Sequence, residues 1–195
     1  MLANLLHVGM GNRVPARCKG LKDRRVAVVC LSGSSSFGST KAAGEIARSL
    51  ERRLEKNVKG IEVISQQEID DWRDRNEWNE IDYLELGRGV SAETVLAVNL
   101  GSFSLHDGPT LFKGRCDVEM TVYDLLNEGN IVYDSTPTQV QFPINTGQHV
   151  TDTREREFRN KFIEVVASEL SHYFYAYLLE EDYGRDAEML TVSGR

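Results

Sequence analysis

The segment from Ser32 to Lys41 is the part of the sequence whose residue types best suit the binding of a phosphate. The apolar, β-branched run Val26–Leu31 predicts a buried strand, and the glycine- and serine-rich loop Ser32–Ser39 follows it. A helix is expected next, and the amide groups at a helix N-terminus attract anions. This arrangement suggests an anion-binding site formed by Gly33, Gly38, Ser39, Thr40 and Lys41.

The position of the lysine does not match the phosphate-binding loop of nucleotide-hydrolysing enzymes. That pattern is G-x-x-x-x-G-K-[ST], and Gly33 and Gly38 have its spacing, but Lys41 comes two residues late. The later strand predicted at 94–99 also ends without a carboxylate for magnesium. We therefore interpret the loop first as a turn in which Ser39 or Thr40 caps the helix. A nucleotide- or phosphate-binding enzyme that uses residues 32–41 is kept as the alternative function.

The histidines, cysteines and acidic residues form no recognised catalytic or metal-binding pattern, so neither a catalytic residue nor a cofactor is predicted. No two of the four histidines have metal-ligand spacing. The three cysteines are Cys18, Cys30 and Cys116. They match no zinc or redox motif, and Cys30 and Cys116, which lie in predicted strands, are interpreted as small buried residues. The acidic cluster within 68–80 contains no calcium-loop pattern and is interpreted as a solvated face.

Two tryptophans are the best candidates for contact with a partner protein. Trp72 and Trp78 lie in a charged, asparagine-rich segment, where an exposed aromatic side chain can anchor a partner. The alternative is that the two indoles cover an edge of the sheet.

The composition indicates one globular domain. The chain has 195 residues, of which 41% are hydrophobic and 27% charged, and it is long enough to bury a core without disulfides or metals. Its net charge of −7 argues against a general nucleic-acid binder, which needs a basic surface. No apolar stretch is long enough to span a membrane.

The periodicity of apolar residues predicts the elements that would position these groups. Helices are expected over about 40–54, 66–75, 83–87 (stopped by Gly87 and Gly89) and 153–181, the last with Asp152 and Glu155 in a capping-box arrangement. Strands are expected at 26–31, 61–64, 94–105, 112–124 and 131–142. Residues 112–122 alternate strictly between apolar and polar side chains, which is typical of a strand with one wet face.

Together these elements predict an α+β, sandwich-like fold with a mixed sheet. An opening strand–helix unit is followed by an antiparallel meander, and a long C-terminal helix packs on the sheet. The expected organisation is an exposed lead-in at 1–23, a single α/β domain at 24–181 and a polar tail at 182–195.

Several segments resemble a group of bacterial envelope proteins. They include R-V-A-V (25–28), the helix A-G-E-I-A-R-S-L-E-R-R-L (43–54), L-G-R-G-V-S-A-E-T-V-L-A-V-N-L (86–100), V-Y-D-L (122–125) and G-N-I-V-Y-D (129–134). The chain is similar in these segments to the α/β domain of the curli-secretion lipoprotein CsgG, the penicillin-binding-protein activator LpoB and the TolB amino-terminal domain. Glu93 stands where those families usually have Asp, and Asn99 precedes Leu100-Gly101. R-V-P-A (13–16) and E-F-R-N-K-F (157–162) are similar to an uncharacterised bacterial subfamily.

The resemblance implies a function without catalysis. Such domains assemble, anchor or regulate envelope machinery, often as lipoproteins, so a protein partner in the envelope and a homo-oligomer are both compatible with it. No lipobox surrounds Cys18. A periplasmic or outer-membrane location is therefore expected if an upstream signal and lipid anchor were removed, and a cytoplasmic one otherwise.

Overall fold

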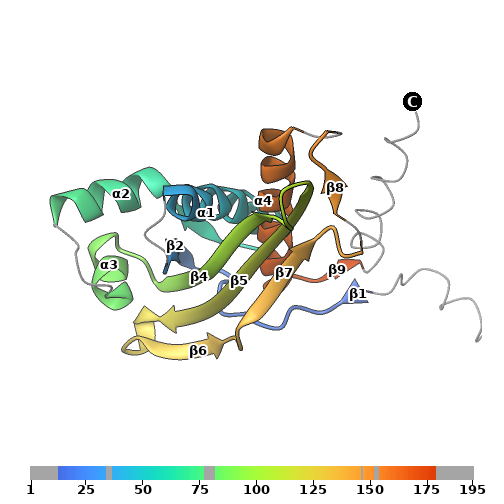
Figure 1. Cartoon of the computed structure of the whole chain (residues 1–195). Helices are drawn as coiled ribbons and strands as arrows, with labels where there is room; N and C mark the ends of the chain where they lie inside the picture. Colours follow the sequence, from blue (N-terminus) through green and yellow to red (C-terminus); the bar gives the residue numbers. More distant parts are fainter. Residues whose placement is uncertain (1–12, 34–36, 77–81, 146, 152–153, 179–195) are drawn as a thin grey trace, which may run out of the picture.

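The computed structural model describes residues 13–33, 37–76, 82–145, 147–151 and 154–178, which form a mixed sheet with helices on both faces (Figure 1). The helices are α1 (Phe37–Asn57), α2 (Gln66–Arg75), α3 (Tyr83–Gly89) and α4 (Glu155–Ser171). The strands are β1 (Arg13–Val14), β2 (Arg25–Ser32), β3 (Glu62–Ile64), β4 (Thr94–His106), β5 (Leu111–Asp124), β6 (Asn130–Asp134), β7 (Thr138–Phe142), β8 (Gln148–His149) and β9 (Tyr177–Leu178).

The main sheet has the strand order β3-β2-β4-β5-β6. β2 is parallel to both β3 and β4, whereas β4 and β5 are antiparallel. β6, β7 and β8 pair one after another with β5. The predicted fold class, a mixed sheet with an opening strand–helix unit and an antiparallel meander, is confirmed.

The larger core lies between the sheet and the pair of helices α1 and α4. β5 contributes its apolar phase, and every residue of that phase from Phe112 to Val122 is buried. α1 contributes Ile46, Leu50 and Leu54 to the same cluster. The strict alternation of the sequence therefore reports which side of β5 the helices cover.

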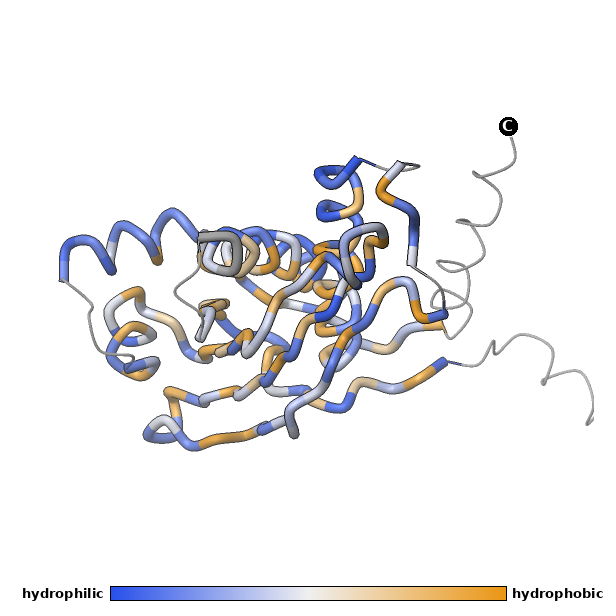
Figure 2. Tube along the Cα trace, viewed as in Figure 1, coloured by the Kyte–Doolittle hydropathy of each residue, from blue (hydrophilic) through white to orange (hydrophobic). Residues whose placement is uncertain are grey.

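A smaller core lies on the opposite face, under α2 and α3. It contains Ile69 and Leu86 from these helices and Ala27, Val29 and Val95 from β2 and β4. Figure 2 shows that α2 itself is mainly hydrophilic, in keeping with a helix in which only Ile69 is fully buried. Around β5 and β7 this face carries polar side chains, such as those of Ser102, Asp117 and Gln139, which hydrogen-bond to one another.

The C-terminal helix is shorter than the sequence predicted. α4 ends at Ser171, ten residues before the expected boundary, and the chain turns so that β9 pairs with β1. The carbonyl of Tyr173 accepts hydrogen bonds from the amides of Arg17 and Cys18, both at 2.9 Å. The apolar periodicity continued through Phe174 because that side chain is buried in the core, although it lies beyond the helix.

The lead-in is not wholly exposed, which corrects another expectation. Cys18 and Leu21 are buried, and β1 belongs to the two-stranded pairing with β9. The predicted capping box is also wrong, because Arg154 occupies the N-cap position of α4 and makes no side-chain capping hydrogen bond. Asp152 lies outside the described residues.

Two helix boundaries near glycines differ from the prediction. α1 begins at Phe37, so Ser39 and Thr40 lie inside the helix and not at its N-cap position. α3 continues through Gly87 to Gly89. Gly87 is needed for close packing, since a Cβ there would lie 2.4 Å from Val95 Cγ2 and 2.6 Å from Leu125 Cδ1.

Candidate functional site

Among the described residues, those suggested for anion binding do not surround a common binding site. Gly33 donates its amide to the carbonyl of Leu100 at 2.9 Å, and Gly38 lies in the first turn of α1. Lys41 is exposed and lies in a shallow hollow with Glu45 and the start of α4, where Arg159 forms an ion pair with Glu45. Residues 34–36 lie outside the described part of the chain, so phosphate binding by this loop remains a prediction.

Trp72 is half-buried and packs against the smaller core. A Cβ at Gly89 would lie 2.0 Å from Trp72 Nε1, so α3 approaches the indole where a glycine leaves room. Trp78 lies outside the described residues. Partner binding by the two tryptophans therefore remains a prediction.

His106, His172 and the three cysteines contact neighbouring parts of the described fold. His106 packs against Phe112, with ring centroids 5.0 Å apart, and the buried ring of His172 stacks on Tyr177 at 3.8 Å. Burial raises the pKa of the Cys116 thiol to about 12 and also raises the pKa values of the Cys18 and Cys30 thiols. The interpretation of Cys116 as a buried residue is confirmed, Cys30 is partly buried, and Cys18 is buried although the lead-in was expected to be exposed. Within the described ranges, no group of three His, Cys, Asp or Glu side chains is placed to hold a metal ion.

A groove between α4 and β7 is a concave site that none of the predicted residues lines. It has a volume of about 330 Å³. Its apolar lining comes from both sheet and helix, and Gln139, Gln141 and Glu169 add polar groups. The apolar residues include Val118, Met120, Val140, Val165 and Leu170. Ile144 also lines the groove and is 62% exposed.

The backbone of β7 presents hydrogen-bonding groups at the outer edge of the sheet. The carbonyl of Met120 accepts from the Ser135 amide, and the Met120 amide donates to Ser135 Oγ, both at 2.8 Å, so Met120 directs its backbone groups toward this side of β5. Alternate residues of a strand point their amides and carbonyls the same way. Val118 and Cys116 therefore bond Thr138 and Val140, their register partners. The backbone groups of Gln139 and Gln141 consequently point away from β5.

These two features combine an open strand edge with an apolar groove. Among the described strands, β7 pairs only with β5. An extended segment of another protein could add to such an edge and place alternate side chains in the groove. Sequence reasoning missed this site because residues 138–144 and the lining residues of α4 come together only in the folded chain. The exposed Ile144, next to Pro143, was the one local signal.

Solved structures of other proteins are similar to this fold, whereas sequence comparisons find no match. No protein-family model matches the sequence, and no curated protein is significantly similar to it. Lipoprotein GNA1162 from Neisseria meningitidis is a structural match at 12% identity and a TM-score of 0.50, over 75% of this chain and 97% of that chain. The protein and this lipoprotein share an α/β fold.

Two further solved structures are similar over long stretches at slightly lower TM-scores. PelC from Paraburkholderia phytofirmans, a dodecamer, is 15% identical over 85% of this chain and 99% of that chain, with a TM-score of 0.49. The LpoB C-terminal domain from Salmonella enterica is 14% identical over 61% of this chain and 83% of that chain, with a TM-score of 0.43. LpoB is among the families that the sequence segments resemble.

Among the described helices, none is long and apolar enough to cross a membrane.

Proposed function

We propose that the protein is a non-catalytic binding or assembly domain of the bacterial cell envelope that acts through protein–protein contacts. The observation that carries the proposal is the groove between α4 and β7, together with the outward-facing backbone of Gln139 and Gln141. The lipoprotein fold supports an envelope location, either in the periplasm or at the outer membrane.

The groove suits an extended peptide segment of the partner. Backbone hydrogen bonds to β7 would supply affinity without regard to sequence, while the apolar lining would select the side chains that enter the groove. Val140 and Phe142 are almost fully buried and fix the floor. The exposed side chain of Ile144 would lose water contact on binding, which favours association.

A pull-down from envelope extracts of the source bacterium tests this proposal with two kinds of variant. Gln139→Pro removes an outward-facing amide, whereas Gln139→Ala keeps that amide and loses only the hydrogen bond from Gln139 Nε2 to Asp117. Ile144→Asp places a charge at the groove. Its matched control is Ile131→Asp on β6, which alters a similarly exposed isoleucine away from the groove.

The expected result is a specific partner that wild type, Gln139→Ala and Ile131→Asp retain and that Gln139→Pro and Ile144→Asp lose. Circular dichroism of each variant checks that the fold is kept. A partner retained equally by all five proteins would contradict binding at the groove.

Trp72 and Trp78 are proposed as a second contact surface for the same kind of partner. Trp78→Ala is the cleaner test, because Trp72 also packs on the smaller core. Unchanged capture by Trp78→Ala, and by a folded Trp72→Ala, would argue that the tryptophans serve the fold alone.

A further inference from the structure

A second pocket lies between α1 and α4. Val165 of α4 lines both this pocket and the groove. The volume of the pocket is about 460 Å³. α1 contributes Arg53 and Lys56 to the lining, and α4 contributes Lys161 and Glu164. The two helices pack against each other, which brings together residues more than a hundred positions apart in the sequence.

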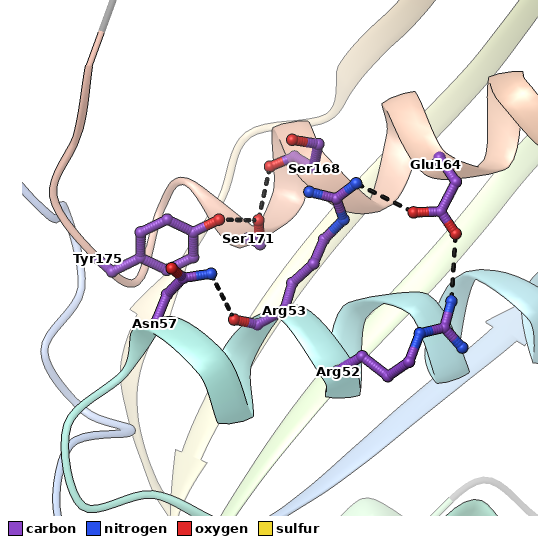
Figure 3. Close-up of polar contacts among 7 residues, drawn as sticks. All are labelled: Arg52, Arg53, Asn57, Glu164, Ser168, Ser171 and Tyr175. Atoms are coloured by element: carbon purple, nitrogen blue, oxygen red, sulfur yellow. Dashed lines mark hydrogen bonds and ion pairs between the residues drawn. The ribbon is translucent and has the colours of Figure 1, made fainter. Parts of the chain in front are cut away.

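The ionic contacts of this pocket leave an excess of positive charge. One carboxylate, that of Glu164, accepts from Arg52 Nη2 at 3.2 Å and from Arg53 Nη2 at 3.0 Å (Figure 3). Lys56 and Lys161 are exposed and form no ion pair with any described residue. Three cations of the pocket lining, Arg53, Lys56 and Lys161, therefore accompany a single lining carboxylate, with Arg52 next to it outside the lining, in a chain whose net charge is −7.

The helix dipole accounts for only one of these cations. Lys56 lies in the last turn of α1, where a positive charge favours the helix. Lys161 lies in the middle of α4 and far from its end, and its ammonium group is 5.8 Å from the centre of the Phe142 ring. Like charges gathered around one pocket repel each other unless an anion offsets them.

The inner wall of the pocket is ordered by hydrogen bonds and ring stacking. Tyr175 and Ser171 bond through their hydroxyl oxygens at 2.7 Å, and Asn57 Nδ2 donates to the carbonyl of Arg53 at 2.8 Å. Figure 3 shows these side chains on the side of Arg53. The buried His172 ring, which also lines the pocket, stacks on Tyr177. These contacts hold Tyr175, Asn57 and His172 in place beside the cations, which limits the conformational entropy lost on binding.

We propose that this pocket binds a multiply charged oxyanion of the phosphate type, with Lys56, Lys161 and Arg53 as the principal contacts. Arginine and lysine side chains are the usual partners of phosphate oxygens, arginine through its planar fork and lysine as a point charge. The phosphate group could belong to a free small molecule or to a lipid headgroup, and the same contacts would serve both.

Isothermal titration calorimetry of the full chain with pyrophosphate at low ionic strength tests the proposal. Each of Lys56→Gln and Lys161→Gln should weaken binding about fivefold, the effect of losing one favourable exposed charge contact. Glu164→Gln should strengthen binding, because it removes the only carboxylate of the pocket and releases both arginines. The matched control is Lys59→Gln, an exposed lysine outside the pocket lining, which should bind like wild type.

Flotation with phosphatidylcholine vesicles, with and without cardiolipin, distinguishes the two sources of phosphate. Cardiolipin-dependent flotation that Lys56→Gln and Lys161→Gln weaken would assign the site to a headgroup, whereas pyrophosphate binding without flotation would assign it to a free ligand. The proposal is overturned if wild type binds neither probe, or if Lys59→Gln weakens binding as much as the two pocket variants. Neither result depends on the groove at β7, so the two proposals succeed or fail separately.

Discussion

Glu51 shows how one partly buried carboxylate can make the stability of the whole protein depend on pH. It lies on the sheet side of α1, and Gln66 Nε2 donates both to Glu51 Oε1 and to the carbonyl of Val28, each at 2.7 Å. Burial is the main cause that raises the pKa of Glu51 from 4.5 to about 7, and the hydrogen bond from Gln66 only partly opposes it. The folded protein therefore holds a proton on Glu51 that the unfolded chain releases.

Because the folded state binds more protons between pH 4.5 and about 7, its stability falls as the pH rises through that window. Replacement of Glu51 by Gln removes the charge and keeps an acceptor oxygen for Gln66. Relative to wild type, Glu51→Gln should raise the free energy of unfolding by about 1–2 kcal/mol at about pH 8 and change it little at about pH 4.5.

Urea denaturation at both pH values measures this difference. The control is Glu119→Gln on the exposed phase of β5, which should leave the pH profile of wild type intact. An equal stabilisation by Glu51→Gln at the two pH values would show that its charge is not the cause.

At the scale of elements, the distance between α4 and the sheet is set at Gly114. A Cβ at this position of β5 would lie 2.5 Å from Phe162 Cγ, and the Phe162 ring is fully buried and packs against Phe103. The ring cannot move outward without displacing α4. Gly114→Ala should therefore destabilise the protein by about 2–3 kcal/mol through overpacking.

The matched control is Gly101→Ala on β4, the strand that neighbours β5. A Cβ there would come no nearer than 3.5 Å to Asp117 Cβ, so the expected change is within about 0.5 kcal/mol. Urea denaturation of the two variants compares them directly. Similar stabilities for both would mean that α4 can shift to make room for the extra methyl group.

The elements predicted best are those whose signal is local. The bounds of α2 agree with the prediction, because Ser65 caps the helix through its hydroxyl group and the apolar residues of the segment have helical spacing. The alternation in β5 predicted which residues are buried. α4 was predicted too long, because Phe174 is buried in the larger core beside Tyr133 although it lies beyond the end of the helix.

At the scale of the whole molecule, both proposed sites lie where segments distant in sequence meet. The groove needs β7 beside α4, and the basic pocket needs α1 beside α4. No spacing rule connects Lys56 with Lys161, so as a phosphate site the sequence could suggest only the loop at 32–41, whose candidate residues are close neighbours. The glycine-rich segment could be recognised because its residues are consecutive in the sequence. The groove and the basic pocket could not, because their residues are far apart in the sequence.

This contrast leads to a prediction for the alternative function, a nucleotide- or phosphate-binding enzyme that uses residues 32–41. ATP carries several negative charges, and any ligand that binds the folded state raises the melting temperature. Lys41 lies beside Glu45 and the start of α4, whereas Lys56 and Lys161 line a pocket with surplus positive charge. We therefore expect the stabilisation by ATP to depend on Lys56 and Lys161 and not on Lys41.

A thermal-shift titration of wild type, Lys41→Gln and the double variant Lys56→Gln/Lys161→Gln measures this dependence. At a ligand concentration a hundredfold above the dissociation constant, the stabilisation is about 2.7 kcal/mol, or roughly 5–10 °C for a chain of this size. Wild type and Lys41→Gln should shift equally, and the double variant should shift far less. A smaller shift for Lys41→Gln than for the double variant would assign the phosphate site to the loop at 32–41 and favour the enzymatic alternative. The anion would then bind at the N-terminus of α1, where the sequence first suggested it.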